Sequence, residues 1–304
     1  MILGLSLPGT GGVINLGPEL SADIHTRSMN TWDQLGDALT SGDIDSAFIN
    51  IPLAMDLVNA GLDISLLMFV NRGGSQMICH PNISKIAEFS GKSVLIPHQL
   101  TVQHMLIHKL ISTKGLKLAD SAGERQVWAE PVAPGLMPEM MAGDGDGDIA
   151  AFIAPAPFTT DASGRGWGRQ MLSTQALWEN HPCCGFVVKN VLIHPYYDEL
   201  QALVGLFFES AIILDHHVTG SHELDVSSLQ LAADFLGKPA SLTRTALTSS
   251  GVMFAPEHLI PCTAPLEIIQ AYMSDTMGLL DNTTDLNTFI NPAFARNAMT
   301  ELSP

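Results

Sequence analysis

The stretch GDIDSAFINIP at residues 42–52 recurs as GDGDIAAFIAP at residues 145–155, in register and without gaps. The first glycine, two aspartates, an alanine and the final proline hold the same positions in both copies. Each copy predicts a helix that ends at glycine, an acidic turn, and a buried strand that proline terminates at the edge of a sheet. We therefore expect two lobes of like construction, each presenting a strand end to a shared cleft.

Short apolar runs alternate with amphipathic segments along the rest of the chain. We expect strands at residues 2–7, 46–50, 64–70, 75–80, 93–97, 150–154 and 185–189. Apolar residues at three- and four-residue spacing predict helices at residues 31–41, 102–114, 138–142, 196–214 and 266–280. Such alternation is typical of an α/β architecture.

The composition indicates a compact globular protein with an acidic surface. The 304 residues suffice for about two domains. Hydrophobic residues make up 46% of the chain and charged residues only 15%, which excludes a disordered chain. The net charge of −17 repels phosphate backbones, so no nucleic-acid partner is expected. An anionic ligand would need a local site of amide donors and a cation.

The sequence contains no segment that predicts a transmembrane helix. The longest largely apolar stretch, residues 203–214, is too short to span a bilayer and contains Glu209. Met1 leads into an expected strand without the features of a signal peptide. We therefore expect either a cytoplasmic protein or a mature chain from which a signal segment was removed.

Four blocks of sequence resemble a known family. They are DALTSGDIDSAFINIPLAMDLVNAGLDI from residue 37, NRGGSQMICHPN from residue 71, IAEFSGKSVLIPHQLTVQHMLIHKLISTKGL from residue 86 and LWENHPCCGFVV from residue 177. In this order the blocks resemble the substrate-binding proteins of nitrate/sulfonate/bicarbonate-type ABC importers, a group that includes thiamine-precursor-binding proteins. The resemblance covers residues 32–188 and is weaker through the C-terminal helices.

The resemblance implies a type II periplasmic-binding-protein fold, in which two α/β lobes close around a ligand. Lobe one would comprise residues 1–96 and 190–304, and lobe two residues 97–189. The implied function is capture of a small organic or oxyanionic ligand for an ABC permease. The implied location is periplasmic, or extracellular and membrane-anchored, if a signal segment was removed, and otherwise cytoplasmic.

Two departures from the family pattern bear on specificity. The family has a long helix after its first strand, whereas here residues 8–12 lead into a short segment. Nitrate-type members carry a GEPW-like sequence where this chain has APAPF at residues 154–158. The resemblance therefore does not predict nitrate or bicarbonate as the ligand.

Candidate ligand contacts follow the expected strand ends. A helix that begins near Thr101 would direct its N-terminal amides at an anion, with His98 as a further donor. The alternative is an ordinary helix cap with a surface histidine. Arg72 offers a cation beside Gly74 and Ser75, and its alternative is a flexible hairpin with an exposed arginine. Amide-lined turns or strand ends add Gly9, Thr10, Gly11, Asn50 and Pro157.

The segment before the return strand adds Trp178, Asn180 and His181, which could stack on a ligand and hydrogen-bond to it. The alternative is that this tryptophan packs in the hydrophobic core. The adjacent Cys183 and Cys184 are interpreted as buried inert thiols, with a redox or metal role as the alternative.

No catalytic residue, metal site or cofactor is predicted. The run Asp144–Asp148 starts like a calcium loop, but Ile149 and Pro155 replace the required glycine and glutamate, so a solvated acidic turn is expected. The histidines at 216, 217 and 222 lack metal-ligand spacing. Neither a nucleophile elbow nor a nucleotide-binding glycine motif is present.

We therefore expect a binding protein rather than an enzyme, with a small, preferentially anionic ligand and an ABC permease as partners. Enzymes of pyrimidine-precursor synthesis and of the menaquinone pathway share the implied fold and form the first alternative. The second alternative is a ligand-sensing domain of a receptor, which would use the same cleft.

Overall fold

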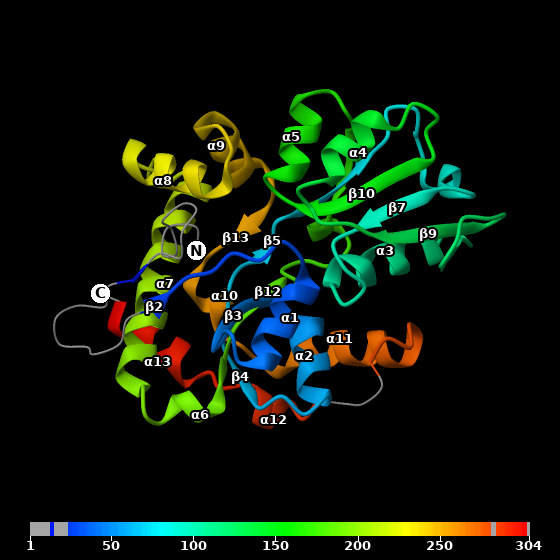
Figure 1. Cartoon of the computed structure of the whole chain (residues 1–304). Coiled ribbons are helices and arrows are strands. Elements are labelled where there is room, and N and C mark those ends of the chain that lie inside the picture. Colours follow the sequence, from blue (N-terminus) through cyan, green and yellow to red (C-terminus); the bar gives the residue numbers. More distant parts are fainter. Residues whose placement is uncertain (1–12, 15–23, 281–283, 303–304) are drawn as a thin grey trace. The chain divides into compact units, whose positions relative to one another are not determined.

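The computed structural model describes residues 13–14, 24–280 and 284–302. The chain divides into two compact units (Figure 1). Unit 1 comprises residues 1–72, 182–244 and 253–304, and unit 2 comprises residues 73–181 and 245–252. The chain therefore passes from one unit to the other four times.

This division departs from the expected lobes at the first crossing. The expected boundary lies at Pro97, whereas unit 2 already begins at Gly73. The reason is the strand β6 (Ser75–Cys79), which pairs with strands of unit 2 on both of its sides. The second crossing lies between His181 and Pro182, whereas the expected boundary lies between residues 189 and 190, and residues 245–252 join unit 2 in addition.

The core of unit 1 is a three-stranded sheet in the order β3-β12-β4. Its strands are β3 (Ser46–Asn50), β12 (Cys184–Lys189) and β4 (Ile64–Phe69), and β12 is antiparallel to both neighbours. All six residues of β4 are buried, as expected for a strand covered on both faces. Short strands β1 (Val13–Ile14) and β2 (Ile24–His25) pair separately.

Helical segments make up much of unit 1. They are α1 (Trp32–Ser41), α2 (Ile51–Asn59), α6 (Asn190–Ile193), α7 (Tyr197–Val218), α8 (Val226–Leu236), α10 (Pro256–Leu259), α11 (Thr263–Ala271), a π-helical turn (Tyr272–Thr276), α12 (Leu286–Phe289) and α13 (Ala293–Leu302). The ring of Phe207 on α7 lies 5.0 Å from that of Phe48 and 5.2 Å from that of Phe186. Phe48 belongs to β3 and Phe186 to β12, so these ring contacts anchor α7 to the sheet.

The helix α1 shows how local sequence sets an element. The Thr31 hydroxyl accepts a hydrogen bond from the Gln34 amide and caps the N-terminus. Gly42 ends the helix with a φ of 90°, a left-handed conformation that favours glycine. The glycine and acidic turn that open the repeated stretch therefore separate α1 from the buried strand β3, as the sequence predicts.

Unit 2 is built on a six-stranded sheet in the order β11-β6-β10-β7-β9-β8. The strands other than β6 are β7 (Ser93–Ile96), β8 (Lys117–Ala119), β9 (Gln126–Pro131), β10 (Ile149–Pro155) and β11 (Arg169–Ser173). The pairs β10/β7, β7/β9 and β8/β9 are parallel, and β6 is antiparallel to β10 and β11. The two copies of the repeated stretch thus supply one strand to each sheet, the edge strand β3 in unit 1 and the inner strand β10 in unit 2.

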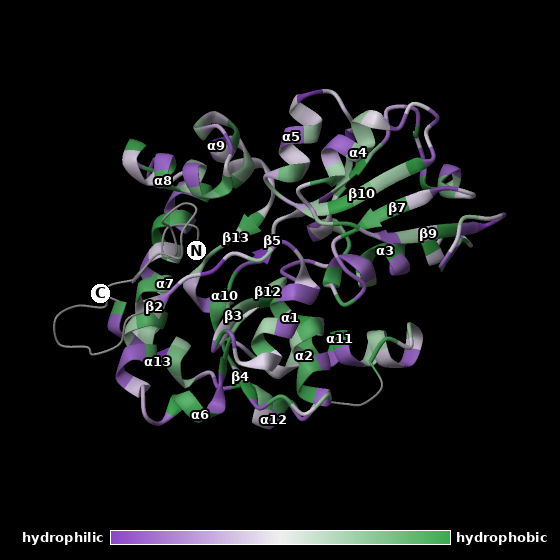
Figure 2. Cartoon of the chain, in the orientation of Figure 1, coloured by the Kyte–Doolittle hydropathy of each residue, from purple (hydrophilic) through white to green (hydrophobic). Residues whose placement is uncertain are grey.

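Both faces of the unit 2 sheet are covered. On one face lie α4 (Met137–Gly143) and α5 (Phe158–Gly164), whose residues pack against Leu95 and Phe152. On the other lies α3 (Val102–Ser112), whose Ile107 and Ile111 pack into a second apolar cluster (Figure 1). The central strands are accordingly hydrophobic along their length (Figure 2).

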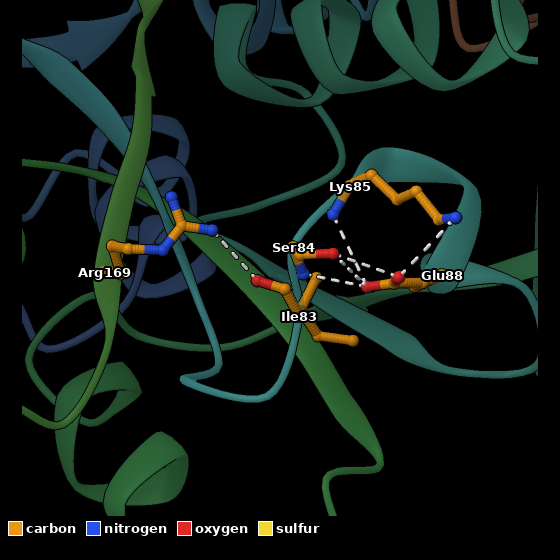
Figure 3. A network of polar contacts seen from close by, with 5 residues as sticks. All are labelled: Ile83, Ser84, Lys85, Glu88 and Arg169. Carbon is orange, nitrogen blue, oxygen red and sulfur yellow. Dashed lines mark hydrogen bonds and ion pairs between the residues drawn. The ribbon is translucent and has the colours of Figure 1, made fainter.

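A polar network closes the turn after β6 (Figure 3). The Glu88 carboxylate accepts hydrogen bonds from the Ser84 amide at 2.8 Å and from the Lys85 amide at 3.4 Å. These bonds cap the 3₁₀ helix Ile86–Phe89 at its positive end. On the neighbouring strand β11, Arg169 donates to the Ile83 carbonyl oxygen at 3.0 Å and fixes the turn against the sheet.

Three elements bridge the two units: β5 (Arg72–Gly73), β13 (Val252–Met253) and α9 (Ala240–Ser249). β5 and β13 pair with each other. Within the described residues, every helix is too short or too polar to cross a membrane.

Candidate functional site

Five strands of unit 2 bring chain ends to one edge of its sheet. The parallel strands β7, β9 and β10 end there. Strand β11 ends there as well, because β10 and β11 both run antiparallel to β6. Strand β6 begins at this edge, where Ser75 pairs with Pro155. In open α/β sheets the carboxyl ends of the strands are where ligands bind. We call this edge the polar edge of unit 2. It consists of Ser75 and the residues that follow β7, β10 and β11.

A chain of hydrogen bonds runs through the polar edge. Gln103 Nε2 donates to Ser75 Oγ at 3.0 Å, and Thr174 Oγ1 donates to the Ser75 carbonyl oxygen at 2.9 Å. His181 Nε2 lies 2.8 Å from the same Thr174 oxygen. All four side chains are buried, and they come from three segments that are far from one another in the sequence. This chain of bonds fixes Ser75 and His181, both predicted site residues.

Two threonines after β10 have hydroxyls without a partner. Thr159 is fully buried and Thr160 is 9% exposed, yet neither Oγ1 makes a hydrogen bond. A buried hydroxyl without a partner is costly, so these two threonines are candidate ligand contacts. The sequence predicts ligand contacts only as far as Pro157 and indicates neither threonine. The signal available was their position directly after the second copy of the repeated strand.

The N-terminus of α3 also lies at the polar edge, because Gln103 in its first turn bonds to Ser75. The Thr101 hydroxyl accepts from the His104 amide at 3.2 Å and donates to the His98 carbonyl oxygen at 2.8 Å. Thr101 therefore caps the helix, which is the alternative to an anion site that is given for it above. His98 is half-buried and accepts the Leu100 amide on Nδ1, so its Nε2 carries the proton of the neutral ring.

His104 is the buried histidine of this helix. Its Nδ1 lies 2.8 Å from the Gln99 carbonyl oxygen and donates to it, because a carbonyl only accepts. Burial lowers the pKa of His104 to about 4, with smaller contributions from His108 and His98, while the bond to Gln99 opposes the shift. His104 is therefore neutral at pH 7 and adds no cation to the polar edge.

In unit 1 the corresponding sheet edge carries Asn50 and two cysteines. Asn50 is buried, its Oδ1 accepts from Cys184 Sγ at 3.6 Å, and its Nδ2 has no hydrogen-bond partner. The Sγ atoms of Cys183 and Cys184 are 3.9 Å apart and form no disulfide. The bond to Cys183 and burial raise the pKa of Cys184 well above its ordinary value, so this thiol stays protonated at pH 7.

Arg72 is buried rather than exposed, so the alternative of a flexible hairpin with an exposed arginine is wrong. Its Nε donates to the His258 carbonyl oxygen at 2.8 Å, and its guanidinium carbon lies 4.1 Å from the centre of the Phe69 ring. Burial lowers its pKa, and Cys262 opposes that shift. Arg72 therefore connects the end of β4 to the helix α10 and the loop after it.

The remaining predicted residues fall into three groups. Trp178 lies with its ring 6.1 Å from that of His181, and the Gly74 carbonyl accepts from the Ala156 amide next to Pro157, so these residues belong to the polar edge. Asn180 has a φ of 54° and donates its amide to Gln175 Oε1 at 2.7 Å. Gly9, Thr10 and Gly11 lie outside the described residues.

The acidic turn after α4 is closed by its own backbone. The Asp144 carboxylate accepts from the amides of Asp148, at 3.1 Å, and Ile149, at 2.7 Å. Across the part of the chain that the structure describes, no group of three or more metal-ligating side chains is close enough to hold a metal ion.

Comparisons with known proteins identify a matching family and similar folds. The sequence profile of the NMT1-like family matches residues 19–224. A comparison with curated protein sequences finds no match.

Several solved structures share the fold. The zinc-bound ligand-binding component of an ABC-type import system from Staphylococcus aureus superposes with a TM-score of 0.75 at 19% identity, over 89% of this chain and 86% of that one. The periplasmic nitrate-binding protein NrtA from Synechocystis PCC 6803 gives 0.74 at 15% identity, over 90% and 80%. The desulfurization enzyme DszB gives 0.57 at 15% identity, over 85% and 86%. The type II periplasmic-binding-protein fold predicted from the sequence is thus confirmed.

Proposed function

This chain belongs to the NMT1-like family, and we propose that it is the substrate-binding protein of an ABC importer that captures a small organic or oxyanionic ligand. The observation that carries this proposal is the pair of buried hydroxyls of Thr159 and Thr160, which have no partner at a sheet edge suited to ligands. A ligand that accepts hydrogen bonds would satisfy both.

The local charges favour a ligand with an anionic group. The N-terminus of α3 carries partial positive charge, and His98 has a donor on Nε2. In unit 1, Asn50 has a buried amide donor without a partner, and Arg72 adds a positive charge. Donors thus prevail among these groups although the net charge of the chain is −17. We propose Ser75, His98, Thr159, Thr160, Trp178 and His181 as ligand contacts of unit 2, and Asn50 and Arg72 as those of unit 1.

Names of similar structures support an importer component but leave the ligand open. The Staphylococcus aureus protein is described with zinc, NrtA with nitrate, and the SsuA proteins with sulfonates. The described residues offer no cluster of three metal ligands, so zinc receives no support here. An importer component requires a permease partner and a place outside the cytoplasmic membrane, and we propose both for this protein.

An enzyme remains the second candidate, since DszB shares the fold. That reaction class would need a reactive group near the ligand. Cys184 is a poor nucleophile because its pKa is raised, and Cys183 is buried beside it. We therefore propose binding without chemical change to the ligand.

A thermal-shift screen tests this proposal. Alkanesulfonates, carboxylates, nitrate and aminopyrimidines are added to the protein and to the variants Thr160→Val and Thr113→Val. One class of anionic compound should raise the unfolding temperature of the wild type, and Thr160→Val should reduce that rise. Thr113→Val is the matched control, because the Thr113 hydroxyl bonds to the Leu110 carbonyl on the exposed surface of α3. Stabilisation by aminopyrimidines alone, equal in all three proteins, would contradict the proposed ligand class and site.

A further inference from the structure

Three of the four places where the chain changes unit contain a residue in the left-handed conformation. Gly73 has a φ of 61° at the first crossing, Asn180 a φ of 54° before the second, and Gly251 a φ of 70° before the last. The remaining crossing lies inside α9. Any movement of one unit against the other has to rotate the backbone at such crossings.

One side chain of unit 2 contacts all three of these residues. Gln175 Oε1 accepts from the Asn180 amide at 2.7 Å, and Gln175 Nε2 donates to the Gly251 carbonyl oxygen at 3.0 Å. A Cβ atom at Gly73 would clash with the Gln175 amide and would lie 2.8 Å from the Gly251 carbonyl oxygen. The two ends of this carboxamide therefore bond to residues at two different crossings, and the carboxamide leaves no room for a Cβ atom at the third.

The backbone around Gln175 links the same crossings. The Gly73 amide donates to the His181 carbonyl oxygen at 3.0 Å. The 3₁₀ helix Thr174–Ala176 places Gln175 directly after β11, and the Ser173 hydroxyl caps it by accepting the Gln175 amide at 3.3 Å. Gln175 thus extends from a capped 3₁₀ helix of unit 2 to the segments that lead out of that unit.

We propose that Gln175 is a hinge-positioning residue. It holds the three crossings that lie outside α9 at fixed positions relative to one another, and it thereby limits the relative motion of the two units. The inference goes beyond the proposed function and needs no ligand for its test. It predicts that removing the carboxamide loosens the crossings without unfolding either sheet.

The variants Gln175→Met and Gln175→Glu distinguish the contributions of the two hydrogen bonds that Gln175 makes, to Asn180 and to Gly251. Methionine keeps the length of the side chain but removes both bonds, whereas glutamate keeps an acceptor for the Asn180 amide and loses the donor to Gly251. Gln270→Met is the matched control, because Gln270 Nε2 also donates to a backbone carbonyl, that of Thr284, but within unit 1.

Hydrogen exchange provides the local readout. The Asn180 amide should exchange about tenfold faster in Gln175→Met, as expected for a lost hydrogen bond of about 1.4 kcal/mol, and at the wild-type rate in Gln175→Glu. Amides of residues 250–253 should exchange faster in both variants, and those of β10 should stay unchanged.

The distance between the units provides the decisive readout. Spin labels at Lys109→Cys on α3 and Val226→Cys on α8, in a Cys262→Ser background that removes the exposed native thiol, report one distance distribution. Gln175→Met should broaden this distribution or add a second distance, and Gln270→Met should not. An unchanged distribution in both Gln175 variants would overturn the inference, even if exchange at Asn180 rises. So would equal broadening in Gln270→Met.

Discussion

His181 Nε2 lies 2.8 Å from Thr174 Oγ1 and is the donor in that contact. The assignment follows because Thr174 gives its only hydroxyl proton to the Ser75 carbonyl oxygen, 2.9 Å away. His181 therefore carries its proton on Nε2, and the imidazole is held in one orientation beside Trp178. A predicted ligand contact is thus held in place by Thr174 and Trp178, which both precede it along the chain.

Thr174→Val should destabilise the protein by about 1–3 kcal/mol, because it leaves the buried His181 N–H and the Ser75 carbonyl without this partner. Urea unfolding monitored by tryptophan fluorescence measures the loss. Thr113→Val, which removes an exposed hydroxyl, should change stability by less than about 0.5 kcal/mol. Equal effects from the two substitutions would contradict the role given to Thr174.

Thr159→Val and Thr160→Val should behave in the opposite way. Replacing a buried hydroxyl that has no partner by a methyl group removes an unmet desolvation cost, so stability should stay the same or rise. Ligand affinity should fall about tenfold for each lost hydrogen bond. Urea unfolding without ligand and calorimetry with it measure the two effects. A clear loss of stability would indicate that these hydroxyls have partners within the chain.

The stability of the protein should depend on pH through His104. Its pKa is lowered to about 4 in the folded state by burial, against an ordinary value of 6.5. Between these values the unfolded chain binds the proton and the folded chain does not, so stability falls as pH decreases from about 6.5 toward 4.

The variant His104→Asn isolates this contribution. Its amide can replace the Nδ1 donor to Gln99 and does not titrate in this range. The difference in unfolding free energy between wild type and variant should change with pH over that window, with the wild type losing more on acidification. A difference that is constant from pH 6.5 to 4.5 would contradict the buried neutral state of His104.

Gly73→Ala should destabilise the protein by more than about 1 kcal/mol, since a Cβ is strained at a φ of 61° and meets the Gln175 amide. In a Gln175→Ala background part of that clash is gone, so the same substitution should cost less. The double-mutant cycle should give a coupling of about 0.5–3 kcal/mol. Additive effects within error would show that the two residues do not interact.

Much of the fold follows from patterns that are local in sequence. The strand β3 has its predicted bounds, and β4, β6, β7, β10 and β12 lie within one residue of theirs at each end. These runs are apolar because both faces of their sheets are covered. The sequence does not predict β8 and β9, because these strands are incompletely buried and lack the continuous apolar run that marks the others.

The assignment of β6 to unit 2 could not be predicted from pattern alone. A buried strand looks the same whichever sheet it joins, and its partners β10 and β11 lie far along the chain. The same limit applies to the site. The sequence predicts Ser75 and His181 as neighbours of strand ends, but the bond through Thr174 depends on pairing between distant segments. For Arg72, sequence supplies the charge, whereas its burial against Phe69 follows from packing.

We propose that the protein binds a small anionic ligand at the polar edge of unit 2 and releases it unchanged. Calorimetric titration of the most stabilising compound from the screen, followed by mass spectrometry of the recovered compound, tests this most directly. We expect one-to-one binding that is about tenfold weaker in Thr160→Val, with the compound recovered intact. Conversion of the compound, or tight binding of only neutral or cationic compounds unaffected by Thr160→Val and Arg72→Ala, would contradict it.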